Sequence, residues 1–150
     1  MKTIKEVEQE IIGEFQKRSS VDEKYTHLFS LGEQLPEMDP NLKTGENQVK
    51  GCESTVWFYL RNDQGRLNLE ADSDSLVIKG IAALLARVIS GRRPEELRAF
   101  SLDFINEIDV WKLPSQRNSG LMAMLSHIKN QAEIMERNAP ANKETTEWEN

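Results

Sequence analysis

Cysteine is nearly absent from this chain of 150 residues, which has one, and histidine occurs only twice. A single thiol cannot form an intramolecular disulfide, and it suits a reducing compartment. A structural zinc site needs four ligands, but Cys52, His27 and His127 offer no short ligand pairing. We therefore expect neither a disulfide framework nor a bound metal.

Long apolar runs and a basic surplus are lacking as well. The longest apolar stretch, residues 81–89, is interrupted by Arg87 and falls short of the roughly 20 residues that span a bilayer. The first residues are amphipathic, so we expect no secretory signal. Lys and Arg number 19 against 25 Asp and Glu, giving a net charge of −6, whereas nucleic-acid binding needs a basic face. These features predict a cytoplasmic protein without membrane or nucleic-acid partners.

The length favours one domain, and its 38% hydrophobic and 29% charged residues are typical of globular proteins. Helical spacing of apolar residues predicts a first helix over 3–18. A capping-box pattern at Ser20 and Glu23 begins a second helix, which ends near Gly32 or Pro36. A buried helix is predicted over 74–90. We expect residues 72–74 to supply its N-cap and its acidic first turn. Shorter helices are predicted at 94–97 and 102–108, and a last helix at 118–137, leaving a domain over 1–137 and a disordered tail over 138–150.

β-branched and aromatic residues predict a strand over 54–61, with a hairpin turn at 62–65 and a returning strand through residues 67–71. Residues 47–50 could add a short third strand. The predicted architecture is α+β: a small antiparallel sheet of about three strands packed against several helices.

Cys52 stands just before the main strand, and two readings of it stay open. A free cysteine is commonly a small buried hydrophobe. However, Gly51 lets the backbone bend next to the thiol, and loop–strand junctions often display functional groups. Lys50 would favour the thiolate and Glu53 would oppose it. A Cys–His dyad with His27 or His127 is conceivable, although helix positions favour surface or boundary roles for both histidines.

Four sequence blocks occur in a characteristic order. Residues 51–57 read GCESTVW, residues 71–75 read ADSDS, residues 117–121 read RNSGL, and residues 31–36 read LGEQLP. Together they resemble the conserved blocks of the SufE family over residues 4–137. Two departures are Glu53, where many members have Gln, and Gln116, where members commonly have Ser.

The resemblance implies a SufE/IscU-like fold and a sulfur carrier that needs no cofactor. Cys52 would take sulfane sulfur as a persulfide from a pyridoxal-phosphate cysteine desulfurase of the SufS or CsdA type. It would stimulate that enzyme and pass the sulfur to an iron–sulfur scaffold complex, acting as a carrier rather than a stand-alone enzyme. Loop and cavity neighbours of the thiol are expected to be Val49, Lys50, Gly51, Glu53, Ser54 and Trp57. Supporting roles are expected for Arg117 and Asp74, and a homodimer is compatible with the family.

Two rival functions follow from the same residues. An iron–sulfur scaffold would need several protein ligands, which one cysteine cannot supply. An adaptor would activate the desulfurase while Cys52 stays buried and inert. For a carrier, we expect the partner to gate the Cys52 loop, with residues 45–52 as the moving part, because Gly45 and Gly51 can absorb rotation and residues 46–50 carry little apolar side chain.

Overall fold

The computed structural model describes residues 1–108, 110 and 115–138, with only the backbone described for residues 115–118. The helices are α1 (Ile4–Gln16), α2 (Val21–Glu33), α3 (Leu76–Ile89) and α4 (Ser115–Arg137). Strands β1 (Val56–Asp63) and β2 (Arg66–Ser73) form a hairpin, and the 3-10 helices are η1 (Pro40–Leu42), η2 (Pro94–Leu97) and η3 (Asp103–Ile108). The α+β class is confirmed. The predicted tail lies outside the described residues, apart from Asn138.

The hairpin follows the alternation in the sequence. β1 and β2 pair antiparallel with Val56 opposite Ser73 and Asp63 opposite Arg66. Val56, Phe58 and Leu60 are fully buried, because alternate residues of a strand point to the same face. Residues 64–65 close the turn with positive φ angles of 54° and 86°, so the predicted hairpin is confirmed.

The segment expected as a third strand makes one bridge only. Gln48 pairs with Trp57 at the outer edge of β1, and in the described part of the chain the sheet has two strands. The Val49 N–H donates to the Val56 carbonyl over 2.8 Å, and the Phe58 N–H donates to the Asn47 carbonyl over 2.9 Å. Pairing stops at Asn47, whose own N–H bonds back to Thr44 in a turn.

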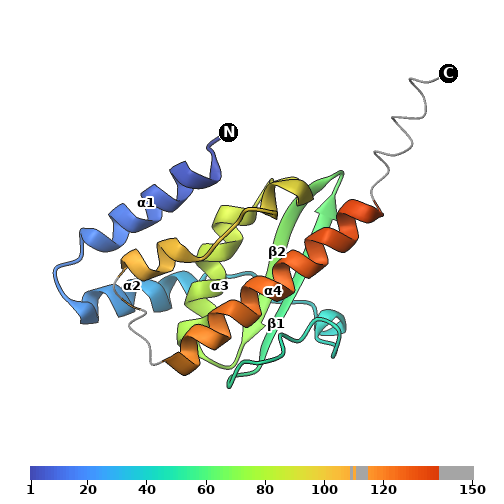
Figure 1. Cartoon of the computed structure of the whole chain (residues 1–150). Helices are drawn as coiled ribbons and strands as arrows, with labels where there is room; N and C mark the ends of the chain where they lie inside the picture. The colour runs from blue at the N-terminus through green and yellow to red at the C-terminus, as the bar shows by residue number, and fades with distance from the viewer. Residues whose placement is uncertain (109, 111–114, 139–150) are drawn as a thin grey trace.

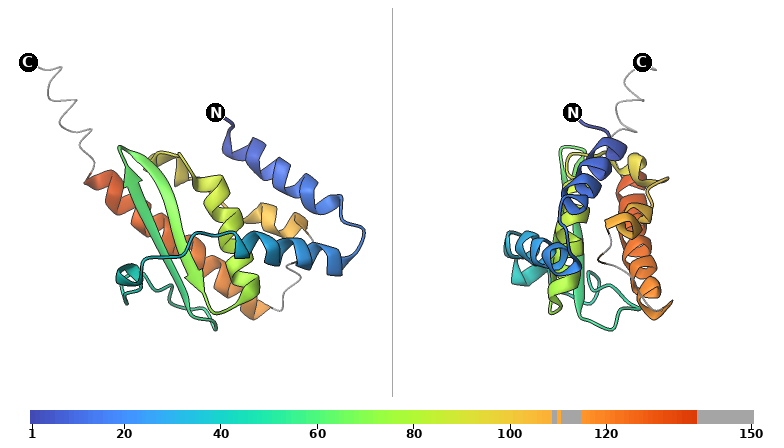
Figure 2. Two further views of the ribbon diagram at one scale, coloured as in Figure 1. Left: turned by 180° about the vertical axis from the view of Figure 1, so that it is seen from behind. Right: turned by 90° about the vertical axis from the view of Figure 1, so that its left-hand side faces the viewer.

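The helices enclose the hairpin from two sides. α3 packs against β2 and α2, α4 packs against β1 and η2, and α1 packs against α3 and η3. Figure 1 shows α4 running obliquely across the front of the hairpin, and Figure 2 shows α2 and α4 on opposite sides when the molecule is seen from its edge. The starts of β1, α3 and α4 lie at one end of the molecule (Figure 1).

α3 begins later than predicted. Its N-cap is Ser75, whose Oγ accepts from the Ile78 N–H, rather than residues 72–74. The Asp72 carboxylate pairs instead with Lys43 and Lys79. α3 crosses α2 closely at Gly80, where a Cβ would lie 2.5 Å from Cγ of Leu28, so a larger residue there would force the two helices apart.

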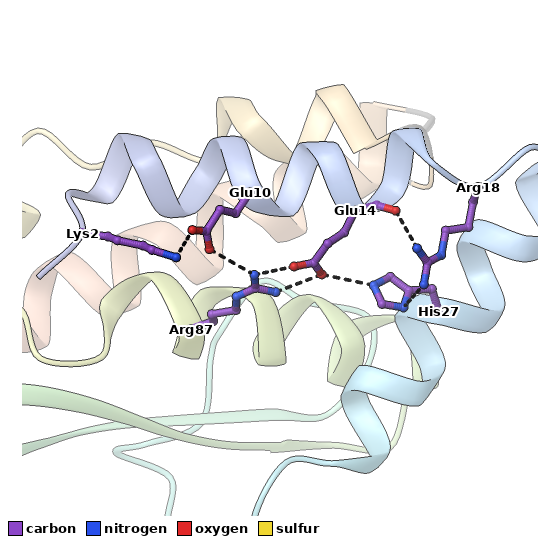
Figure 3. Close-up of polar contacts among 6 residues, drawn as sticks. All are labelled: Lys2, Glu10, Glu14, Arg18, His27 and Arg87. Atoms are coloured by element: carbon purple, nitrogen blue, oxygen red, sulfur yellow. Dashed lines mark hydrogen bonds and ion pairs between the residues drawn. The ribbon is translucent and has the colours of Figure 1, made fainter.

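A cluster of charged residues joins α1 to α2 and α3 (Figure 3). Arg87 on α3 donates to both carboxylate oxygens of Glu14 and lies 3.5 Å from Glu10. These bonds from Arg87 hold the pKa of Glu14 below its ordinary value. We call this the ion-pair cluster; its members are Lys2, Glu10, Glu14, Arg18, His27 and Arg87.

Candidate functional site around Cys52

Cys52 lies at the tip of a short loop whose two ends are anchored. The Val49–Val56 hydrogen bond closes the loop at its base. Gly51 has a φ of 92°, a backbone conformation that residues other than glycine rarely adopt. The predicted backbone bend before the thiol is therefore present, and the Cys52 side chain is half-buried against the core.

The N-terminal part of α4 forms the other wall of the site. Cys52 Sγ lies 3.6 Å from the carbonyl oxygen of Gly120, to which the thiol donates. A Cβ added at Gly51 would lie 3.3 Å from Cβ of Ala123, and one added at Gly120 would lie 3.8 Å from the sulfur. Small residues on the loop and the helix thus let the thiol lie directly against α4.

Burial alone raises the pKa of the Cys52 thiol. Lys50 and Glu53 are both exposed, so solvent screens the effect of their opposite charges on the thiol. A thiol with a raised pKa is mostly protonated near neutral pH and is a poor nucleophile. In this conformation the burial of Cys52 therefore disfavours its thiolate form.

The predicted neighbours fall in three places: the loop itself, the core and strand β1. Lys50, Glu53 and Ser54 lie on the loop, where Ser54 is half-buried and the two charged residues are exposed. Val49 is only 3% exposed and belongs to the core. Trp57 is half-buried on β1, with Lys43 Nζ 5.3 Å from the centroid of its ring. Residues 46–50 carry little apolar side chain, but Val49 enters the core and anchors this part of the loop.

Asp74 holds the other end of the loop. Its Oδ1 accepts from the Thr55 N–H over 3.1 Å, and its own N–H donates to the Thr55 carbonyl over 3.3 Å. The Ser73 hydroxyl also donates to that carbonyl over 2.8 Å. Asp74 thus supports the loop structurally. The Arg117 side chain lies outside the described residues.

Both histidines have other partners. His27 contacts Glu14 and Arg18 in the ion-pair cluster. His127 on α4 is half-buried and points Nε2 toward the Phe58 carbonyl at 3.0 Å. The Cys52 thiol bonds to Gly120 rather than to an imidazole, so the geometry does not support a Cys–His dyad.

Two amide side chains near the loop were missed by sequence reasoning. Asn47 is 9% exposed, and its Oδ1 accepts from Gln131 Nε2 of α4 over 3.2 Å. The spacing of the α4 residues could have indicated their common location. Positions 120, 123, 127 and 131 are three or four residues apart, which places them on one face of the helix.

Across residues 1–108, 110 and 119–138 there is no group of three or more His, Cys, Asp or Glu side chains that could hold a metal ion. No helix of the described part is long and apolar enough to cross a membrane.

The fold and the site define a small α+β domain that presents one thiol at the tip of a loop anchored at both ends. The model of the Fe-S metabolism associated domain, SufE, matches residues 9–132. The chain therefore belongs to the SufE family and acts in iron–sulfur metabolism.

Two SufE-like relatives support this assignment, and one solved structure supports the fold alone. An uncharacterized SufE-like protein of Rhizobium meliloti (strain 1021) is 34% identical over 130 residues, which cover 83% of this chain and 93% of that protein. SufE-like protein 1, chloroplastic/mitochondrial, of Arabidopsis thaliana is 39% identical over 126 residues, which cover 83% of this chain but 34% of the plant protein. A hypothetical protein from Thermus thermophilus, solved in solution, shares the fold with a TM-score of 0.69 at 18% identity, over 85% of this chain and 93% of that one.

Proposed function

We propose that this protein accepts sulfane sulfur on Cys52 from a cysteine desulfurase and carries it as a persulfide toward iron–sulfur cluster assembly. The observation that carries the proposal is the position of the chain's one thiol, at the tip of an anchored loop within the family's signature block. In the transfer step the Cys52 thiolate attacks the terminal sulfur of the desulfurase persulfide. One S–S bond breaks as another forms, and the desulfurase cysteine leaves as a thiolate.

Gating of the loop fits this chemistry. A persulfide in open solvent is exposed to reduction by cellular thiols and to oxidation, so a carrier gains by keeping the sulfur against α4. The structural anchors at Val49 and Thr55 leave residues 50–54 as the proposed moving part, a shorter segment than the 45–52 expected from the sequence. Docking of the desulfurase would release the Gly120 contact and expose the thiol.

The proposed partners rest on family membership. The partners proposed are a pyridoxal-phosphate-dependent desulfurase upstream and an iron–sulfur scaffold complex downstream. The protein is proposed to act in the cytoplasm, because a single thiol suits a reducing compartment. It is proposed to be a carrier and activator without a cofactor of its own, in an assembly compatible with a homodimer.

Mass spectrometry tests the proposal directly. The protein would be incubated with a cysteine desulfurase, pyridoxal phosphate and cysteine, and then digested without reductant. We expect one additional sulfur atom on the peptide that contains Cys52, removable by dithiothreitol. Stimulated desulfurase turnover without sulfur on Cys52 would instead establish the adaptor function.

A further inference from the structure

The outer edge of β1 is completed by a side chain. β2 pairs with one edge of β1. At the other edge, residues 47–49, here called the loop stem, bond to the Val56 carbonyl and the Phe58 N–H. Beyond the point where the stem turns away, the Leu60 N–H donates to Oε1 of Gln131 over 2.9 Å. Nε2 of the same amide lies 3.2 Å from the Phe58 carbonyl.

A primary amide carries a donor and an acceptor, as a peptide group does. Gln131 therefore takes the place that the next residue of a third strand would occupy on β1. This also covers an edge that would otherwise present unpaired main-chain groups. The third strand ends after one bridge, where Asn47 turns back to Thr44, and the α4 side chain continues the pairing along β1.

The same amide holds the stem of the Cys52 loop. Gln131 Nε2 donates to Oδ1 of Asn47 over 3.2 Å, and Asn47 Nδ2 donates to the Leu42 carbonyl over 2.8 Å. Both amide orientations are determined by main-chain partners: the Leu60 N–H requires an oxygen and the Leu42 carbonyl requires a nitrogen. Because Asn47 is buried, loss of the Gln131 donor would leave its oxygen without that bond.

His127 supplements this contact without replacing it. Its Nε2 lies 3.0 Å from both the Phe58 carbonyl and Gln131 Nε2. One tautomer donates to Phe58 and the other accepts from Gln131, but neither provides a partner for Leu60 or Asn47.

We infer that Gln131 is a positioning residue for Cys52: the Gln131–Asn47 pair, here called the amide clamp, fixes the loop stem to β1 and α4. One face of α4 then controls both parts of the loop, the tip through Gly120 and Ala123 and the stem through Gln131. The clamp limits opening to residues 50–54. The importance of the clamp for sulfur transfer rests on the proposed function, whereas the clamp itself can be tested without a desulfurase.

The test is the rate at which iodoacetamide alkylates Cys52 in the native protein. Gln131→Met keeps the length of the side chain and removes its hydrogen bonds. We expect alkylation to become about 5- to 10-fold faster, the effect of losing one or two net hydrogen bonds on a local opening equilibrium. Arg87→Met, in the remote ion-pair cluster, is the control for general destabilisation and should leave the rate unchanged.

Two further variants separate positioning from general loss of structure. Gln131→Glu keeps an acceptor for Leu60 but cannot donate to Asn47, so it should also accelerate alkylation, and it replaces Gln131→Met if that variant fails to fold. Asn47→Ala combined with Gln131→Met should be no faster than the faster single variant, because both remove the same clamp. Any of three results would overturn the inference. The folded Gln131 variants could be alkylated at the wild-type rate, the two substitutions could multiply fully in the double variant, or Arg87→Met could accelerate alkylation equally. Failure of wild-type protein to take up sulfur would refute the proposed function and leave the alkylation result intact.

Discussion

The ion-pair cluster and the amide clamp both join helices that lie far apart in the sequence, but they do so by different means. In the cluster, charged side chains on α1 and α3 share partners with the His27 imidazole on α2, and Arg87 and Glu14 are 35% and 31% exposed. In the clamp, neutral groups on α4, β1 and the loop stem are largely buried, and the Leu60 N–H and Asn47 Oδ1 both depend on Gln131.

This difference predicts different sensitivities to substitution. Partly exposed charges can return to water when a partner is removed, so each pair contributes little to stability. A buried amide whose partner is removed keeps its desolvation cost. The clamp also holds the stem of the Cys52 loop, whereas the cluster joins α1 to α2 and α3 and has no contact with that loop among the bonds that define it. We therefore expect the region of the clamp to be sensitive in both function and stability, and the cluster to tolerate change.

The largest expected effect concerns function. Cys52→Ser should abolish stimulation of desulfurase turnover while the free energy of unfolding stays close to wild type, because serine is nearly isosteric with cysteine. Arg87→Met should retain full stimulation. Turnover measured with saturating desulfurase substrate checks both, and wild-type stimulation by folded Cys52→Ser would contradict sulfur transfer through this residue.

Stability should fall more for the clamp than for the cluster. Gln131→Met should lower the free energy of unfolding by about 1–3 kcal/mol, because the Leu60 N–H and the Asn47 oxygen lose their partner in a buried site. Urea unfolding followed by circular dichroism gives this value. A loss within error of zero would show that water satisfies these groups.

Arg87→Met should cost about 1 kcal/mol or less, the range of partly exposed ion pairs. Raising the salt concentration to about 1 M, where the screening length falls to roughly 3 Å, should reduce this difference from wild type. The same salt should leave the Gln131→Met difference nearly unchanged. Equal salt dependence of the two variants would break the distinction between the regions.

The smallest effect is a pH dependence that comes from His127. Burial lowers the pKa of this imidazole below its ordinary value of 6.5, an effect that the Phe58 carbonyl opposes and Lys50 supports. The folded protein then binds this proton less readily than the unfolded chain, so stability is fully present above pH 6.5 and is lost as the pH falls through the folded-state pKa. Urea unfolding of His127→Gln between pH 7.5 and 5 should show a smaller loss than wild type. Parallel curves for the two proteins would refute this contribution.

Several elements could be predicted because their signals are local. The hairpin followed from alternating residues around Gly65, and α1 followed from helical spacing of apolar residues after Thr3, which caps the helix. The start of α3 was misplaced because Ser73, Asp74 and Ser75 are all good caps, and long-range partners of Asp72 and Asp74 decided among them.

The site was predictable only in part for the same reason. Cys52 and Gly51 could be identified from one short segment. Gln131 could not be connected with Asn47, since 84 residues separate them and a glutamine on an amphipathic helix usually faces water. The sequence shows little apolar side chain in residues 46–50, and only packing shows that Val49 enters the core and anchors the loop.

The sequence by itself determined the chain's single thiol, the glycine that bends the backbone before it, and the local periodicities that make the hairpin and helices. These depend on residue type and on neighbours within a few positions. The tertiary structure decided how the thiol is held: Gly120 contacts its sulfur, burial raises its pKa, and Asp74 and Gln131 anchor the two ends of its loop. Such contacts join residues distant in the chain, and hydrogen bonds and desolvation act only between groups that folding has brought together.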